Sequence, residues 1–345
     1  MTHMWQEILQ EPKVIESCLS LNQKTISAIT ARLEEKPVSN VIIAARGTSN
    51  HAGVYGKYLI EVKKGIPVAL AAPSVFTLYG KNVNMADSLV IAISQSGQAA
   101  DALEVIKSAR KQGAATVAIT NTEDSPLAMM AEFHLFCGAG KEQSVAATKT
   151  FMAQIYLLAQ LVAAWCGDEG FKKDLAQIPS LLIKTLESAD QIKNVVNYYL
   201  FMEECFILAR GMNYPIALEA ALKIQETSYV RAKGYATSDF HHGPFAMVGE
   251  NMPVIVYAPR GESLKDNREI LEKLRKAGAD ILVVSNDPET LAMGDRSIRI
   301  CDVENDLITP FVNAMVAQIF ACNLSVLKGL NPDAPRGLSK VTYTR

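Results

Sequence analysis

The chain has 345 residues, 49% of them hydrophobic and 20% charged, with a formal net charge of −2. This length exceeds the size at which one hydrophobic core usually keeps growing, so we expect two domains. The balanced charge and ordinary composition exclude a low-complexity or disordered chain and give no indication of a nucleic-acid or membrane-surface partner.

The N-terminal segment, Thr2 to Leu33, has the pattern of helical arms that are broken near Pro12. The first residues lack the basic and then apolar pattern of a signal peptide. The most apolar stretch, Tyr156 to Cys166, is too short to span a bilayer. The six cysteines form no Cys-x-x-Cys pair and lie mostly in apolar runs, as free cysteines of a reducing compartment do. These features predict a cytoplasmic protein.

The two halves of the chain repeat the same features at a nearly constant spacing. Three pairs of residues that follow or end strand-like runs are each 164 residues apart: Gly47 and Gly211, Gly97 and Gly261, and Cys137 and Cys301. In each half, short runs rich in β-branched residues alternate with segments of helical length. This pattern indicates a duplicated α/β domain, each copy being a three-layer αβα sandwich with a parallel sheet.

The repeat divides the chain into four parts. We expect an N-terminal helical arm (1–36), a first phosphosugar-binding domain (37–170), a second domain with linking helices (171–330) and a C-terminal tail (331–345). The tail carries Pro332, Pro335 and Gly337, so it is predicted to be irregular.

Two polar turns of the first domain each follow a strand and precede a helix. One contains Gly47, Thr48 and Ser49, and the other runs from Ser94 to Gln98. In an open parallel sheet, ligands bind beyond the carboxyl ends of the strands, where helix N-termini offer N–H groups to anions. Either turn alone is also compatible with an ordinary N-capped connection. Their joint occurrence predicts a phosphate cradle made of Gly47, Thr48, Ser49, Ser94, Gln95, Ser96 and Gln98.

The second domain has lost this pattern. The turn equivalent to Ser94–Gly97 is Ala258-Pro259-Arg260-Gly261, which contains no hydroxyl group. We therefore expect only the first domain to bind phosphate.

Charged residues and histidines gather in the second domain instead. Glu219, Lys223 and Glu226 share one face of a predicted helix, which is also the pattern of a solvated charge ladder. His242 lies in a His-Gly-Pro turn, and histidine suits proton transfer near neutral pH. Adjacent His241 and His242 diverge, and no further ligand follows at zinc spacing. We expect no metal and no other cofactor.

Several short motifs together resemble the sugar isomerase (SIS) domain family. Within this family the chain resembles the isomerase half of glutamine–fructose-6-phosphate aminotransferase, and its pattern is most similar to that of stand-alone SIS-type glucosamine-6-phosphate deaminases. The resemblance runs from about Met4 to Lys340. The motifs are Gly47-Thr48-Ser49, Ser94-Gln95-Ser96-Gly97, Val145-Ala146-Ala147-Thr148-Lys149, Tyr214-Pro215-Ile216-Ala217-Leu218-Glu219, His242-Gly243-Pro244 and Pro335-Arg336-Gly337-Leu338-Ser339-Lys340.

The resemblance implies roles for individual residues. The hydroxyl and amide groups of the two turns would hold the phosphate and sugar hydroxyls, and Val145 and Lys223 would belong to the substrate site. Glu226 would move a proton between C1 and C2, His242 would open the ring, and Lys340 would meet the C2 carbonyl from the tail. In this family the histidine comes from the neighbouring subunit, which implies a homodimer.

The implied reaction converts glucosamine 6-phosphate to fructose 6-phosphate and ammonia. Ala99 stands where the synthase pattern has Thr, and Ala147 where it commonly has Ser. Thr2 stands where a glutaminase domain would carry its nucleophilic cysteine, so glutamine hydrolysis is not expected. The alternatives are a deglycase for fructosamine 6-phosphates, a synthase-type isomerase without a glutaminase domain, and a phosphosugar-binding sensor without catalysis.

Overall fold

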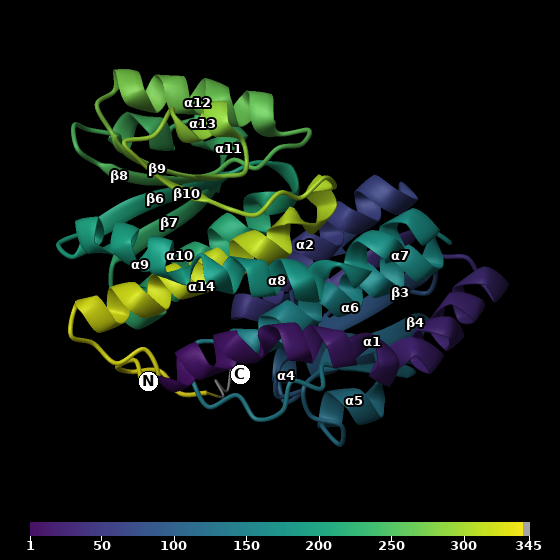
Figure 1. The fold of residues 1–345 in the computed structure, drawn as a ribbon. Helices are drawn as coiled ribbons and strands as arrows, with labels where there is room; N and C mark the ends of the chain where they lie inside the picture. Colours follow the sequence, from purple (N-terminus) through teal and green to yellow (C-terminus); the bar gives the residue numbers. More distant parts are fainter. Residues whose placement is uncertain (341–345) are drawn as a thin grey trace. The chain divides into compact units, whose positions relative to one another are not determined.

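A computed structural model describes residues 1–340 and divides the chain into two compact units, each containing one five-stranded parallel sheet (Figure 1). The first unit consists of Gln10–Glu142, Lys149–Gln177 and the tail from Leu338. The second unit consists of Met1–Leu9, Gln143–Thr148 and Ile178–Gly337. The last five residues of the expected tail, 341–345, lie outside the described residues.

The sheet of the first unit has the strand order β2-β1-β3-β4-β5, with all neighbours parallel. Every residue of β3 and β4 is buried, because helices cover both faces of the sheet. The strands are β1 (Asn40–Ala44), β2 (Val68–Leu70), β3 (Ser88–Ile93), β4 (Ala115–Thr120) and β5 (Phe133–Phe136). The helices are α1 (His3–Glu35), α2 (Gly47–Lys64), α3 (Ser74–Thr77), α4 (Ala100–Lys111), α5 (Pro126–Met130), α6 (Lys149–Trp165) and α7 (Glu169–Ala176), of which α1 begins in the second unit.

The sheet of the second unit has the order β10-β9-β8-β6-β7, and all its neighbours are again parallel. Figure 1 shows α12 and α13 on one face of this sheet and α10 on the other. The strands are β6 (Glu204–Ala209), β7 (Arg231–Ala236), β8 (Pro253–Tyr257), β9 (Asp280–Ser285) and β10 (Arg296–Arg299). The helices are α8 (Ile178–Glu187), α9 (Ala189–Val196), α10 (Tyr214–Ser228), α11 (Thr237–Phe240), α12 (Leu264–Lys276), α13 (Pro288–Leu291) and α14 (Thr309–Leu327), with 3₁₀ turns η1 (Asn197–Tyr199), η2 (Gly211–Asn213), η3 (Pro244–Met247) and η4 (Asp306–Ile308).

The two sheets have the same topology, which confirms the predicted tandem α/β fold. Read from the other end, the second sheet is β7-β6-β8-β9-β10, so each strand occupies the place of its counterpart in β2-β1-β3-β4-β5. Gly47 and Gly211, Gly97 and Gly261, and Gly113 and Gly278 all have positive φ, which the turn after each equivalent element requires. The division 1–36, 37–170, 171–330 and 331–345 is kept as a proposal for the domain limits.

The expected break near Pro12 is wrong, because α1 continues through this residue. Proline removes one helical hydrogen bond, at a cost of about 3 kcal/mol, so other contacts must hold the helix together. Beyond the proline, Cys18 donates to the carbonyl of Cys137, and the Asn22 side chain bonds both backbone groups of Phe136. These contacts fix α1 along the edge strand β5 of the first unit, and propensity along the sequence does not reveal them.

The segment Asp306–Leu327, which contains α14, is long and apolar enough to cross a membrane by length and composition, and it includes an 18-residue window with a mean hydropathy of 1.5. However, 89% of this window is buried inside the protein. Its apolar composition is therefore that of a core helix.

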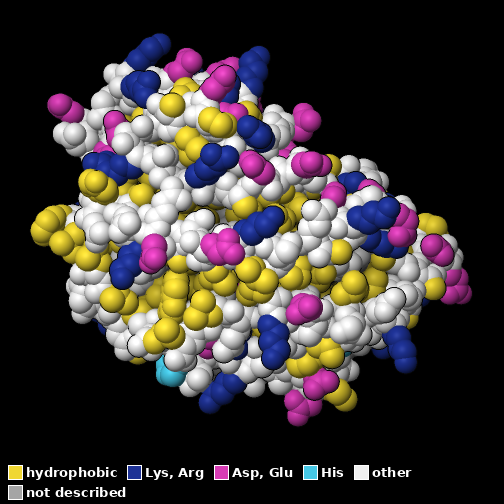
Figure 2. All heavy atoms as spheres, viewed as in Figure 1, with side chains coloured by type: hydrophobic (Ala, Val, Ile, Leu, Met, Phe, Trp, Pro, Cys, Tyr) yellow, Lys and Arg dark blue, Asp and Glu magenta, His cyan; other side chains and the backbone are white. Residues whose placement is uncertain are grey.

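Figure 2 shows basic and acidic side chains interspersed over one face of the molecule.

Candidate active site

The carboxyl ends of β1 and β3 form the topological switch point of the first sheet. These two strands are neighbours, but the chain continues from β1 to β2 on one side and from β3 to β4 on the other. Crossovers in opposite directions leave a crevice at this point, which is where open α/β sheets bind ligands. Both polar turns predicted from the sequence follow these two strands.

The helix after β1 begins without a side-chain cap. Arg46 occupies the N-cap position of α2 in an extended conformation, and its side chain accepts no bond from the helix. Gly47 has φ 51°, which turns the chain from the strand into the helix. The first turn of this helix contains Gly47, Thr48 and Ser49, and the backbone N–H groups of a first turn point out of the helix N-terminus. They therefore face the carboxyl end of the sheet, where an anion is favoured.

The turn after β3 is tightly constructed. The Ser94 hydroxyl accepts from the Gly97 N–H at 3.2 Å, and the Ser96 hydroxyl accepts from the Gln98 N–H at 3.4 Å. Gly97 has φ 65°, and a Cβ atom there would lie 2.1 Å from the Ser125 hydroxyl, so only glycine fits. The following helix α4 also has no side-chain cap. Two uncapped helices of 18 and 12 residues thus begin at neighbouring strand ends.

An ion pair that the sequence analysis missed connects these two helix starts. The Nε and Nη2 atoms of Arg46 lie 3.0 and 2.9 Å from Oδ2 of Asp101, in the first turn of α4. The Asp101 side chain is 4% exposed, whereas that of Arg46 is 55% exposed. The second unit has a similar pair, in which Arg210 Nε lies 3.2 Å from Asp266 Oδ2. The repeated Ala-Arg-Gly tripeptide was the signal in the sequence that could have revealed these two ion pairs.

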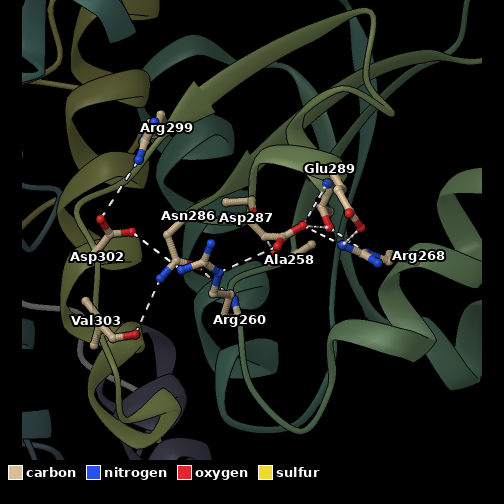
Figure 3. Close-up of polar contacts among 11 residues, drawn as sticks. Ala258, Arg260, Arg268, Asn286, Asp287, Glu289, Arg299, Asp302 and Val303 are labelled. Carbon is tan, nitrogen blue, oxygen red and sulfur yellow. Dashed lines mark hydrogen bonds and ion pairs between the residues drawn. The ribbon is translucent and has the colours of Figure 1, made fainter.

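In the second unit, a carboxylate lies against the turn equivalent to the phosphate cradle. Asp306 Oδ2 accepts from the Glu262 N–H at 3.1 Å, and a Cβ atom on Gly261 would lie 2.4 Å from Asp306. Figure 3 shows Arg260 of this turn between Asp287, at 3.5 Å, and Asp302, at 3.9 Å. Acidic side chains thus contact the groups that an anion would use. This supports the expectation that phosphate binds in the first unit alone.

The charged residues of α10 form a buried cluster. Lys223 Nζ lies 2.6 Å from Glu226 Oε2 and 3.3 Å from Glu219 Oε1. The side chains of Lys223 and Glu219 are 0% exposed, and that of Glu226 is 19% exposed. The alternative of a solvated charge ladder is therefore wrong. Burial alone would lower the pKa of Lys223, but the carboxylates of Glu219 and Glu226 raise it above its usual value, so the ammonium stays charged.

His242 lies in an exposed turn of the second unit, as the His-Gly-Pro motif predicted. Its N–H donates to the carbonyl of Asp239 at 3.0 Å, and Gly243, with φ 137°, separates it from η3. Within residues 1–340, no hydrogen bond or ion pair joins the His242 side chain to Glu226. The two residues belong to the same unit but to separate elements.

Val145 and Lys340 belong to different units. The Val145 N–H donates to the carbonyl of Asp333 at 3.3 Å in the second unit. Lys340 belongs to the first unit, where its Nζ atom lies 2.7 Å from Oε2 of the buried Glu142. Glu142 was not among the site residues predicted from the sequence.

The structure therefore groups the predicted site residues into two sets. The cradle residues and Lys340 belong to the first unit, and the α10 cluster, His242 and Val145 belong to the second. Among residues 1–340, no group of three or more His, Cys, Asp or Glu side chains is arranged to hold a metal ion.

Comparisons with known proteins agree with this organisation. The model of the SIS domain matches residues 36–164 and 203–328. Glutamine–fructose-6-phosphate aminotransferase (isomerizing) from Aquifex aeolicus is 38% identical over 341 residues, covering 98% of this chain and 57% of the relative. The Pyrococcus horikoshii enzyme of the same name is 33% identical, with the same coverage. The chain thus spans little more than half the length of these relatives.

Two solved structures are also similar. The C-terminal domain of glucosamine-fructose-6-phosphate aminotransferase from Francisella tularensis has a TM-score of 0.86 and 28% identity, covering 97% of this chain and 98% of that domain. Glucosamine-6-phosphate deaminase from Thermotoga maritima has a TM-score of 0.77 at 22% identity, covering 99% of this chain and 100% of that one, which shows the shared fold alone.

Proposed function

The chain belongs to the SIS domain family, and we propose that it is a phosphosugar isomerase that deaminates an aminosugar 6-phosphate. The observation that carries this proposal is the pair of uncapped helix starts at the switch point of the first sheet. Such a site favours the dianion of a phosphate ester without requiring a lysine. The sugar then extends away from this anchor.

The proposed reaction converts glucosamine 6-phosphate and water to fructose 6-phosphate and ammonia. His242 assists opening of the ring, which exposes the C1 aldehyde. Glu226 takes the proton from C2 and returns one to C1, which leaves an imine at C2. Water adds to this imine and ammonia leaves. A carboxylate suits the transfer because it can accept a proton from C2 and donate a proton to C1, and the Glu226 Oε2 atom lies 2.6 Å from Lys223 Nζ.

The remaining parts of the proposal concern assembly and location. We propose a homodimer in which His242 serves the neighbouring subunit's site, and Lys340 meets the C2 carbonyl. Residues Val145 and Lys223 complete the substrate site. The six cysteines are all free, which supports a reducing, cytoplasmic location.

A second candidate is synthesis of glucosamine 6-phosphate, the reverse direction at the same site. The names of the relatives from Aquifex aeolicus and Pyrococcus horikoshii favour it, since both are aminotransferases. A deglycase for fructosamine 6-phosphates uses the same proton transfer and stays open. A sensor without catalysis does not need a buried ammonium between two carboxylates, so the α10 cluster counts against it.

One assay separates these candidates. The protein is incubated with glucosamine 6-phosphate, fructosamine 6-phosphates, or fructose 6-phosphate plus ammonium, and ammonia and sugar phosphates are measured. Release of ammonia and fructose 6-phosphate from glucosamine 6-phosphate supports the deaminase. Turnover of a fructosamine 6-phosphate alone selects the deglycase, and binding without turnover of any substrate refutes the enzyme proposal.

A further inference from the structure

A buried carboxylate holds the tail lysine in the first unit. Glu142 is 0% exposed at its side chain, and its Oε2 atom lies 2.7 Å from Lys340 Nζ. Thr150, at the start of α6, donates its N–H to Oε1 at 3.1 Å and its hydroxyl to Oε2 at 2.7 Å. Glu142 and Lys340 are 198 residues apart in the sequence. A charge-assisted pair of this kind, supported by further hydrogen bonds, fixes the position of the ammonium group.

Hydrogen bonds connect this ion pair to the phosphate cradle through Asn121. Its N–H donates to the carbonyl of Gln95, in the cradle turn, at 2.9 Å. Its side-chain amide donates to the carbonyl of Gly140 at 2.7 Å and accepts from the N–H of Ala139 at 2.9 Å. Glu142 follows Gly140 by two residues. The cradle and the lysine therefore rest on one connected set of backbone segments at the carboxyl edge of the sheet.

The second unit keeps the asparagine but uses the acidic residue differently. Figure 3 shows Asn286 bonded to the backbone of Arg260, at 2.8 Å, and of Val303, at 3.4 Å. Asp306 lies 164 residues after Glu142, the spacing of the repeat, and contacts the N–H of Glu262. In the second unit, the Asp306 carboxylate therefore accepts a hydrogen bond from the turn that is equivalent to the cradle turn. The glutamate of the first copy, one methylene longer, binds the tail instead.

We propose that Glu142 is a positioning residue that holds the Lys340 ammonium beside the phosphate cradle and so docks the C-terminal tail for catalysis. The inference rests on the proposed function in one respect, the action of Lys340 on the sugar. The docking itself is a property of the first unit and is tested without any substrate.

The first experiment measures docking by the rate at which an amine-acylating reagent labels Lys340, followed by mass spectrometry of the tail peptide. Glu142→Gln keeps the shape of the side chain and one acceptor oxygen for Thr150 but removes the charge that holds the lysine, so labelling of Lys340 is expected to accelerate at least about tenfold. The matched control is Asp306→Asn, the equivalent change in the second unit, which is expected to leave this rate unchanged. Equal labelling in wild type and Glu142→Gln overturns the proposal.

The second experiment asks whether Glu142 acts through Lys340. With the substrate found in the panel assay, Glu142→Gln is expected to lower kcat by about 10²-fold while KM changes little, since the cradle is intact. In a Lys340→Met background the same change is expected to alter kcat by less than about twofold. If Glu142→Gln lowers kcat by the same factor in the Lys340→Met background as in the wild type, the two residues act independently and the positioning role is overturned.

Two outcomes remain to be separated from these. If no phosphosugar is turned over, the proposed function fails while the labelling result still decides the docking. If Glu142→Gln does not fold, Glu142→Asp keeps the charge on a side chain one methylene shorter. Labelling of Lys340 in that variant is expected to fall between wild type and free lysine, and labelling at the wild-type rate overturns the proposal.

Discussion

Replacing Lys223 by methionine tests the buried cluster of α10. The change keeps an unbranched, apolar side chain one atom shorter than lysine, but it leaves the Glu219 and Glu226 carboxylates without the ammonium that both contact. Removing one partner of a buried ion pair costs about 3–5 kcal/mol, because the remaining charge is buried and uncompensated. We therefore expect the free energy of unfolding, measured by urea denaturation at pH 7, to fall by about this amount.

The pH dependence of this effect follows from the sign of the shift. The folded-state pKa of Lys223 is raised, so its stabilisation is fully present below the pKa of the unfolded chain and is lost only as the pH rises through the folded value. The cost of Lys223→Met should therefore be constant between about pH 7 and pH 9.

A matched control is the exposed pair of Arg231 and Glu203 in the same unit, with side chains 71% and 82% exposed. Arg231→Met is expected to change the free energy of unfolding by less than about 1 kcal/mol. If Lys223→Met lowers the free energy of unfolding by no more than this control does, the buried cluster does not stabilise the fold to the extent that its burial implies.

Three further predictions concern the cradle, the base and the absence of a metal. Ser94→Ala with Ser96→Ala should raise KM for phosphorylated substrates, since each hydroxyl removed from a charged ligand costs about 1.5–3 kcal/mol; unaltered phosphate affinity by calorimetry would place the anion elsewhere. Glu226→Gln should slow exchange of the C2 proton, followed by solvent deuterium incorporation, by about 10²–10⁴-fold, and exchange at the wild-type rate would assign the base to another carboxylate. Prolonged treatment with a chelator should leave turnover unchanged, whereas activity that returns only with added zinc or magnesium would contradict the prediction.

The sequence predicts the fold because the relevant signals are local and occur twice. The strands β3 and β4 are apolar at nearly every position, which only a sheet covered on both faces explains. The glycines at Gly97 and Gly261 mark equivalent turns with positive φ. Two concordant copies reduce the chance that either pattern is accidental.

The polar contacts of the site could not be predicted in the same way, because their partners are distant in sequence. Arg46 reaches Asp101 across 55 residues, and Glu142 reaches Lys340 across 198. Neither pair follows from periodicity or propensity. The continuation of α1 through Pro12 could not be predicted for the same reason, because it depends on contacts with the sequence-distant strand β5.

The duplication also suggests why the two copies diverged at the same structural position. A turn at the carboxyl end of a parallel strand presents N–H groups that need an acceptor. In the second unit the Asp306 carboxylate supplies one to the Glu262 N–H. In the first unit the equivalent acid, Glu142, binds Thr150 and Lys340 instead, so it does not compete for the turn from Ser94 to Gln98. In the first unit the serine hydroxyls of this turn, rather than a carboxylate, accept from its N–H groups, and the negative charge of Glu142 is paired with Lys340. Neutral acceptors repel an approaching phosphate less than a carboxylate would.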